Sequence, residues 1–428
     1  PIRIDIPKGP FVPTFDEQQA GHQTSAAEQA APVEFMTAQP AVLVRPLANL
    51  TTNPNDDHLS IGLTAELVHA LGHYKEIRVL ERLHQHYESS SPELDCDFII
   101  DGNIRRDPVG VTVAISLCDA KKGIQIWSGK YRGGRETVKM ISFQEDVAAE
   151  VAVRIAGGNA IISRHLSGNS KNKKAADLTI YEAMMRYWEY DTLRTRQKFM
   201  RAIRALEHAA DREPDIGQIW SMLAAQYADN CGLESVARRT PLEKAAEFAR
   251  KGISLEPTNR GARTVLAYVR LLQNRLREAR SEAETAYNMC PNSLMVLDTI
   301  GWVTALAGDW ERGIRYIKKT IQLNPYYRPW VHHALCLNEF RTGNYEAAYR
   351  ETLNFMMPEC HWDPLLKAAA CGQLGKIEEG QAAVQALLAL KPDFAKRGRI
   401  LISRYVKFED IADRIIEGLG KLGLKIES

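Results

Sequence analysis

Several kinds of site and segment are missing from this sequence. No apolar run approaches the roughly 18 residues of a membrane span, and no signal peptide is visible. No glycine-rich phosphate loop follows the first predicted strand, since residues 45–57 hold proline, asparagine and threonine but no glycine. A nucleophile elbow, paired metal-binding aspartates and a kinase motif are also missing. A mononucleotide site of the usual kind, a serine hydrolase site or a cyclase active site is therefore not expected within this chain.

An excess of one charge sign is missing as well. The 428 residues carry 55 Lys and Arg against 53 Asp and Glu, so no strong attraction to nucleic acid or anionic membrane is implied. The seven cysteines are odd in number and lack a CxxC motif, which indicates reduced thiols in a cytoplasmic protein. The histidines and cysteines near His73 and His333 lack a recognised ligand spacing. No metal and no other cofactor is expected.

A proline period organises the second half of the chain. The marking residues are Pro214, Pro257, Pro291, Pro325, Pro358 and Pro392, with gaps of 43, 34, 34, 33 and 34 residues. A period near 34 closed by proline predicts about six helix–turn–helix repeats over residues 177–394. Small residues recur at fixed places, as in Gly301, Gly308-Asp309-Trp310 and Gly313. The pattern resembles the tetratricopeptide repeat family, which implies an all-α superhelix that binds proteins.

Two segments depart from this period. The second unit holds about nine extra residues around Cys231–Thr240, which accounts for the 43-residue gap. Residues 395–428 follow the last unit and include an amphipathic stretch, Phe408–Leu424. Because a solenoid needs its terminal apolar face covered, we expect these residues to form C-terminal capping helices.

Residues 41–166 predict a separate α/β domain. The expected strands are Ala41–Val44, Ile77–Leu80, Phe98–Ile104, Val111–Leu117 and Ile124–Trp127. Short turns separate the last three, which predicts an antiparallel meander. One helix is expected from Asp56 to Leu71. A second is expected after Ser142, with Glu145 completing a capping box, and running on towards Leu166.

The same segment resembles the TolB-like (FlgO-like) domain of bacterial regulators. The residues that carry the resemblance are Ala41-Val-Leu-Val-Arg-Pro-Leu-Ala-Asn-Leu50, Ser60-Ile-Gly-Leu-Thr-Ala-Glu-Leu67, Arg78-Val-Leu-Glu-Arg82, Asp97-Phe-Ile-Ile-Asp-Gly-Asn-Ile-Arg105 and Phe143-Gln-Glu-Asp-Val147. Arg45 departs from the family pattern. The resemblance implies that tetratricopeptide repeats follow and that a DNA-binding winged helix or a cyclase domain precedes. Residues 1–40 read as an extended arm and linker. Since the chain starts at Pro1 without methionine, we expect a fragment whose output module lies upstream.

The first helices of the repeats are expected to line a partner-binding groove. The candidate groove residues are Tyr268, Asp298, Trp302, Trp330, His333, Leu337, Arg341 and Trp362. The alternative is that the aromatic members fill the core between repeats. Recognition of a carboxylate terminus is not favoured, because Thr264, Asp298 and His333 stand where lysine and asparagine would be needed. Direct nucleic-acid binding is not favoured either, because glutamates interrupt the arginine-rich stretch 260–280.

These features predict a non-enzymatic, cytoplasmic, bacterial regulatory protein or a fragment of one. Its repeats would bind a protein or peptide partner, and its α/β domain a small-molecule signal. A polar hinge at residues 167–174 would relay that signal to an N-terminal output module that acts in signal transduction or transcription regulation. A homodimer is a further expected state. The alternatives are the regulatory region of an adenylate-cyclase-type enzyme and a scaffold without signal input.

Overall fold

The computed structural model describes residues 39–51, 56–74, 76–81, 95–106, 110–134, 140–158, 160–170, 173–289, 296–324 and 327–427. The predicted arm and linker over 1–40 therefore lie outside the described residues, except for Gln39 and Pro40. None of the helices in those ranges is long and apolar enough to cross a membrane.

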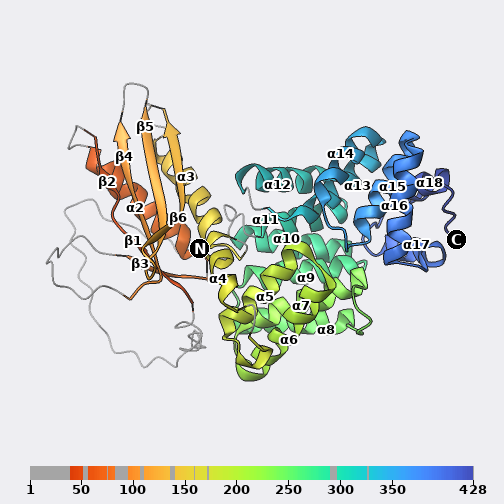
Figure 1. Ribbon diagram of the computed structural model, residues 1–428, viewed down its shortest axis with the longest axis horizontal. Helices are drawn as coiled ribbons and strands as arrows, with labels where there is room; N and C mark the ends of the chain where they lie inside the picture. The colour runs from red at the N-terminus through yellow and green to blue at the C-terminus, as the bar shows by residue number, and fades with distance from the viewer. Residues whose placement is uncertain are drawn as a thin grey trace, which may run out of the picture. The chain divides into compact units, whose positions relative to one another are not determined.

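A six-stranded mixed sheet comes first (Figure 1). Its strands are β1 Ala41–Val44, β2 Ala48–Asn49, β3 Arg78–Glu81, β4 Phe98–Arg106, β5 Val111–Asp119 and β6 Ile124–Gly133. The order is β3-β1-β4-β5-β6, with β2 beside β4. β1 runs parallel to β3 and β4, whereas β5 runs antiparallel to both of its neighbours, β4 and β6. The predicted meander is confirmed, and its strands are longer than expected.

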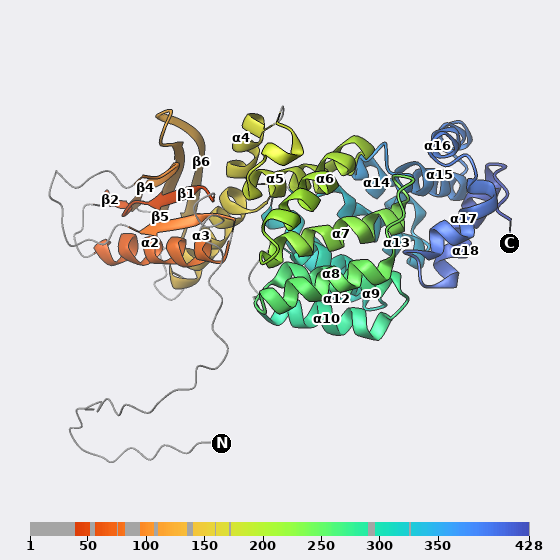
Figure 2. The same cartoon turned by 90° about the horizontal axis from the view of Figure 1, so that it is seen from below.

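Two helices cover one face of this sheet, as Figure 2 shows. α2, Asp57–Gly72, buries Leu59, Leu63, Leu67 and Leu71 at helical spacing, as predicted. α3 is Met140–Ala156. Their apolar sides meet alternate residues of β5 in one core. The alternation places one face of the sheet in that core.

The helix expected after Ser142 is present as α3, but its extension towards Leu166 is wrong. α3 already begins at Met140, so Ser142 lies inside its first turn and is not its N-cap. It ends at Ala156, where Gly157 and Gly158 interrupt the helix, and α4 follows as Ile161–Ser170. Two consecutive glycines disfavour a helix because they gain most backbone freedom outside it. The first half of the predicted hinge, residues 167–170, belongs to α4.

Twelve helices then form six antiparallel pairs in the part of the chain that the structure describes (Figure 1). They are α5 Ile180–Leu193, α6 Arg196–Arg212, α7 Gly217–Leu233, α8 Leu242–Leu255, α9 Arg260–Leu272, α10 Leu276–Met289, α11 Leu297–Leu306, α12 Trp310–Leu323, α13 His332–Thr342, α14 Tyr345–Phe355, α15 Trp362–Leu374 and α16 Ile377–Leu390. The short helices η3, Ala175–Asp177, and η4, Pro329–Val331, precede α5 and α13. The chain is thus an α/β sheet region followed by an all-helical array of the tetratricopeptide type.

The Gly-Asp motif inside the repeats forms the turn between paired helices. Gly308 has φ 105° and ends the first helix, and Asp309 accepts a hydrogen bond from the Arg312 N–H at 3.3 Å to cap the second. Gly343, at φ 76°, and Asn344 repeat the arrangement. Glycine favours the left-handed region, and Asp or Asn suits an N-cap. The two positions therefore set the turn in these two repeats.

The recurring small residues let paired helices approach closely. A Cβ added at Gly313 would lie 2.4 Å from the backbone N of Ala305 and 2.5 Å from the Gly301 carbonyl oxygen. Replacing Gly313 with alanine is expected to lower the free energy of unfolding by about 1–3 kcal/mol, because the helices must separate. Urea denaturation tests this. Gly420→Ala is the control, since nothing lies within 4 Å of its added Cβ. Equal stability of the two variants would contradict the close-packing argument.

The C-terminal segment packs against first helices of the last repeats. α17 is Phe394–Ser403 and α18 is Glu409–Lys421. α18 lies on α15 and α13, and buries Ile411, Ile415 and Leu419. The predicted amphipathic helix is present, and it covers two repeats rather than the last one alone. Between α17 and α18 the chain inserts Tyr405, which is 3% exposed, among the first helices.

Candidate functional site

A cavity of about 170 Å³ opens onto the first helices of the first four repeats. The charged and phenolic side chains that the repeats contribute to its lining are Tyr187 and Asp191 from α5, Arg194 directly after it, Asp229 from α7, Tyr268 from α9, Asp298 from α11, and Arg328 before η4. The three aspartates are at most 5% exposed. First helices of successive repeats therefore bring polar groups to one place.

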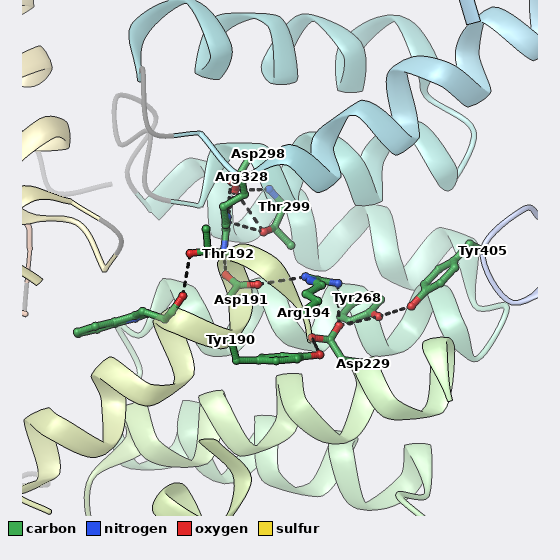
Figure 3. Close-up of polar contacts among 11 residues, drawn as sticks. Tyr190, Asp191, Thr192, Arg194, Asp229, Tyr268, Asp298, Thr299, Arg328 and Tyr405 are labelled. Carbon is green, nitrogen blue, oxygen red and sulfur yellow. Dashed lines mark hydrogen bonds and ion pairs between the residues drawn. The ribbon is translucent and has the colours of Figure 1, made fainter. Parts of the chain in front are cut away.

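One end of the cluster is built on Arg328 (Figure 3). Its Nε donates to Asp298 Oδ2 at 2.7 Å, and its Nη2 bonds Asp298 Oδ1 and, at 3.1 Å, Thr299 Oγ1. Its Nη1 bonds Asp191 Oδ2. Asp298 is held further by the Thr299 N–H at 2.6 Å. Arg328 therefore joins the first repeat to the fourth through a forked, charge-assisted contact.

The other end is built on Arg194 (Figure 3). Its Nη2 donates to Asp191 Oδ1 and its Nη1 to Asp229 Oδ1, both at 3.1 Å. Asp229 also accepts from the hydroxyl of Tyr190 at 3.0 Å and from that of Tyr268 at 3.1 Å. The Tyr268 and Tyr405 hydroxyls are 2.8 Å apart. The chain of contacts thus continues from the first repeats to the C-terminal segment.

Arg194 adopts an uncommon backbone conformation. It ends α5 with φ 48°, in the left-handed region that non-glycine residues seldom occupy. Its N–H donates to the Tyr190 carbonyl at 2.6 Å. In this conformation its side chain lies between Asp191 and Asp229, while the ring of Trp330 lies 5.0 Å from its guanidinium carbon. Such residues persist where surrounding contacts hold them and are frequent at functional sites.

The electrostatics of the cluster are unequal. Three carboxylates face two guanidiniums, which leaves one negative charge in excess if all are ionised. Burial alone would raise the pKa of Asp191, but Arg328 and Arg194 hold it below its usual value. Burial raises the pKa of Asp229, and the nearby Asp191 charge adds to this rise despite Arg194. Of these two carboxylates, Asp229 therefore takes up a proton more readily.

The predicted groove residues lie mostly in the interior. Tyr268, Asp298, Trp302, Trp330, His333, Leu337 and Trp362 are all at most 7% exposed. Tyr268 and Asp298 line the cavity. Arg341 lies apart, with its guanidinium 5.7 Å from the ring centre of Trp310 and bonded to Asn338. Contact between these residues and a partner stays a prediction. The alternative, in which the aromatic side chains fill the core between repeats, agrees with their burial.

Tyr405 is the centre around which the aromatic members gather. Its ring lies 5.3 Å from that of Trp302, 5.8 Å from His333 and 5.8 Å from Trp362. Trp302 Nε1 donates to His333 Nδ1 at 3.2 Å. Burial, followed by the positive charge of Arg194, lowers the pKa of His333 to about 3. The proton of neutral His333 therefore resides on Nε2, because Nδ1 accepts a hydrogen bond.

His361 is a second buried imidazole in this region. It is 2% exposed, and its ring lies 5.9 Å from that of Trp362. Burial lowers its pKa to about 3, and the charges of Lys391 and Arg404 act in the same direction. The described ranges show no group of three or more potential metal ligands. Both imidazoles are buried side chains with lowered pKa values.

Sequence reasoning missed the residues that carry the network. Asp191, Arg194, Asp229, Arg328 and Tyr405 lie outside the predicted set. A signal was available for Asp229, which follows Ala224, Ala225 and Ala228 on a helix that holds no other charged residue. A charged residue on a buried helix face needs a partner. Arg328 lies in an irregular connection, where helical spacing gives no guide.

Comparison with known proteins gives distant similarities. No protein-family model matches the chain. It is 21% identical to putative adenylate cyclase 3 of Rhizobium meliloti (strain 1021) over 168 residues. This match covers 37% of the present chain and 27% of that protein. The chain thus spans well under two thirds of this curated relative.

The structural similarities concern helical repeats. YrrB, described as a tetratricopeptide repeat protein with an unusual peptide-binding site, is 14% identical over 48% of this chain and all of its own, with a TM-score of 0.28. The Cut9–Hcn1 heterotetramer is 13% identical, covering 65% and 52% of the two chains, with a TM-score of 0.42. A human IFIT1 dimer with m7Gppp-AAAA is 12% identical, covering 68% and 70%, also with a TM-score of 0.42. The assignment of a repeat array rests on the helix pairs themselves.

Proposed function

We propose that this chain is a non-enzymatic regulatory protein, or the regulatory part of one, that binds a protein or peptide partner at the cavity on its first helices. The observation that carries the proposal is that cavity, whose walls hold buried charges already fixed by the fold. Fixed polar groups in a concave site orient a ligand at little entropic cost. The proposal includes a cytoplasmic location.

The charge of the cavity favours one kind of partner segment. Both guanidiniums, Arg194 and Arg328, already bond two aspartates each. Neither is free to bind a terminal carboxylate, whereas the excess negative charge attracts a cation. A partner segment with a lysine or arginine side chain, whose stem could lie against Tyr187 and Tyr268, fits this lining best.

Blocking the cavity tests the proposal. Val265 lines it and is only partly buried, so Val265→Arg is expected to fill it and to repel a basic partner segment. Leu353→Arg is the matched control, because Leu353 is 51% exposed and does not line the cavity. In pull-downs from bacterial lysate, Val265→Arg should lose partners that Leu353→Arg and the unchanged protein retain. Equal recovery by all three folded proteins would refute binding at the cavity.

The wider proposal is signalling. The α/β region would act as a TolB-like domain that takes a small-molecule signal, and the repeats would pass the resulting state to an output module, for example one that regulates transcription. The similarity to putative adenylate cyclase 3 supports a second candidate, the regulatory region of a cyclase. An assay of cyclic AMP formation by the full-length gene product separates the two candidates. Cyclase activity that changes when Val265→Arg is introduced supports the regulatory region of a cyclase. The absence of cyclase activity supports the non-enzymatic regulator.

A further inference from the structure

The connection between α17 and α18 lies against the first helices of the repeats instead of on the outer surface. It consists of residues 404–408, Arg-Tyr-Val-Lys-Phe, which we call the inserted segment. Tyr405 and Val406 are buried, and the other three residues are half-buried. Connections between helices usually run over the surface of a protein. The burial of this one is therefore a feature that its contacts must account for.

The tyrosine of the inserted segment is enclosed by first helices. Its ring stacks on that of Tyr268 with 6.4 Å between the ring centres, and the two hydroxyl oxygens are 2.8 Å apart (Figure 3). A Cβ added at Gly232 of α7 would lie 2.1 Å from the Tyr405 hydroxyl oxygen, so the glycine leaves room for that group. The residues that enclose Tyr405, here called the tyrosine site, come from the first helices of five repeats: Gly232, Tyr268, Trp302, His333 and Trp362.

The extra residues of the second repeat supply another anchor. Glu234 lies in this insertion, with φ 49°. Arg404 Nη2 bonds Glu234 Oε1, and Arg404 Nη1 donates to the Cys231 carbonyl oxygen at 2.8 Å. Burial alone would raise the pKa of Glu234, but the hydrogen bonds from Arg397 and Arg404 lower it to about 2. Glu234 is therefore ionised at neutral pH and binds the basic residue beside the tyrosine.

The remaining residues of the inserted segment bind less uniformly. The ring of Phe408 lies 6.3 Å from that of Trp310, at the turn between α11 and α12. Lys407 donates to the Ser403 carbonyl oxygen at 2.9 Å, and burial lowers the pKa of its ammonium to about 8. Burial thus disfavours the charged form of Lys407. The segment is docked at a cost that its release would recover.

These contacts resemble those of a bound peptide. An aromatic side chain enclosed by the groove and a basic side chain beside it are the anchors expected of a peptide ligand. We infer that the inserted segment is an autoinhibitory ligand of the repeat groove. A partner displaces it with an extended segment of the same chemistry, a basic residue followed by tyrosine and an aliphatic residue. Because the inserted segment is tethered at both ends, its effective concentration exceeds that of a free peptide, and it must be released before a partner binds.

This contact is separate from the partner cavity described above. Of the residues in the tyrosine site, Tyr268 alone also lines that cavity. Binding at the tyrosine site and binding at the cavity can therefore fail independently. Val265→Arg, which fills the cavity, is expected to leave peptide binding at the tyrosine site unchanged.

A fluorescent peptide of residues 402–408 tests the proposal with the full chain. Arg404→Glu combined with Tyr405→Ala removes both anchors from the inserted segment and leaves the tyrosine site intact. In fluorescence anisotropy, the peptide is expected to bind this double variant at least about tenfold more tightly than the unchanged protein. The matched control is Arg399→Glu with Tyr349→Ala, which removes an arginine and a tyrosine outside the inserted segment. It should bind the peptide as weakly as the unchanged protein.

Further arms locate the peptide and guard against misfolding. A peptide with alanine in place of tyrosine should lose at least about tenfold in affinity for the double variant, and Glu234→Gln in that variant should also weaken binding. Arg404→Met alone changes a half-buried residue, so it serves as a milder variant whose peptide binding should exceed that of the unchanged protein. Circular dichroism identifies the folded variants. Absence of peptide binding to every folded variant, or equal binding by the unchanged protein and the double variant, would overturn the proposal.

Discussion

Replacing Arg328 with methionine is expected to lower the free energy of unfolding by about 3–5 kcal/mol. The methionine keeps much of the side-chain volume but removes the cation that bonds Asp191 and Asp298. Both carboxylates are at most 5% exposed, so they cannot recover their hydration without local unfolding. The cost of the change is therefore the cost of two buried charges that have lost a partner. Urea denaturation followed by circular dichroism measures it.

Two further variants show whether the network is responsible. Arg399→Met removes an arginine that is also bonded to two carboxylates, Glu409 and Asp413, but is 42% exposed. Its loss should cost no more than about 1 kcal/mol. Adding Asp298→Asn to Arg328→Met should restore part of the lost stability, because one unpaired charge disappears. The interpretation fails if Arg328→Met and Arg399→Met are equally stable.

The repeat array was predictable because its determinants are local. Gly308 and Gly343 must take left-handed turns, and Gly313 must admit a neighbouring backbone, so each position restricts the residue type. Similar turn and packing needs return in several units, which contributes to the period near 34. The break at Gly157 and Gly158 was also readable, but the apolar spacing that continues beyond it favoured one long helix.

The polar network was not predictable in the same way. Asp191 and Arg328 are 137 residues apart in sequence, and their contact depends on how successive repeats stack. Periodicity tells which face of a helix is inward, but not which inward charges meet. It also could not tell that Tyr405, from beyond the last repeat, occupies the space beside Trp302 and His333. The aromatic groove residues consequently appear in the core.

Acidification is expected to destabilise the protein steeply below about pH 6.5, because of His333 and His361. Each has a pKa of about 3 when folded, against an ordinary histidine pKa of 6.5. Between pH 3 and pH 6.5, each of these histidines binds a proton in the unfolded chain but stays neutral in the folded protein. Stability is therefore complete above pH 6.5 and falls as the pH decreases. The slope approaches about 1.4 kcal/mol per pH unit for each histidine, or nearly 3 for both.

Non-titrating variants separate this effect from general acid unfolding. His333→Gln and His361→Gln should each be less stable at pH 7, yet each should lose about half of the slope between pH 6 and pH 5. Asp229 acts in the opposite sense, because a raised carboxyl pKa makes proton uptake favour the folded state. His208→Gln, at an exposed position on α6, is the matched control and should leave the slope unchanged. If the slope of the unchanged protein is flat from pH 7 to pH 5, neither imidazole can be held neutral by burial.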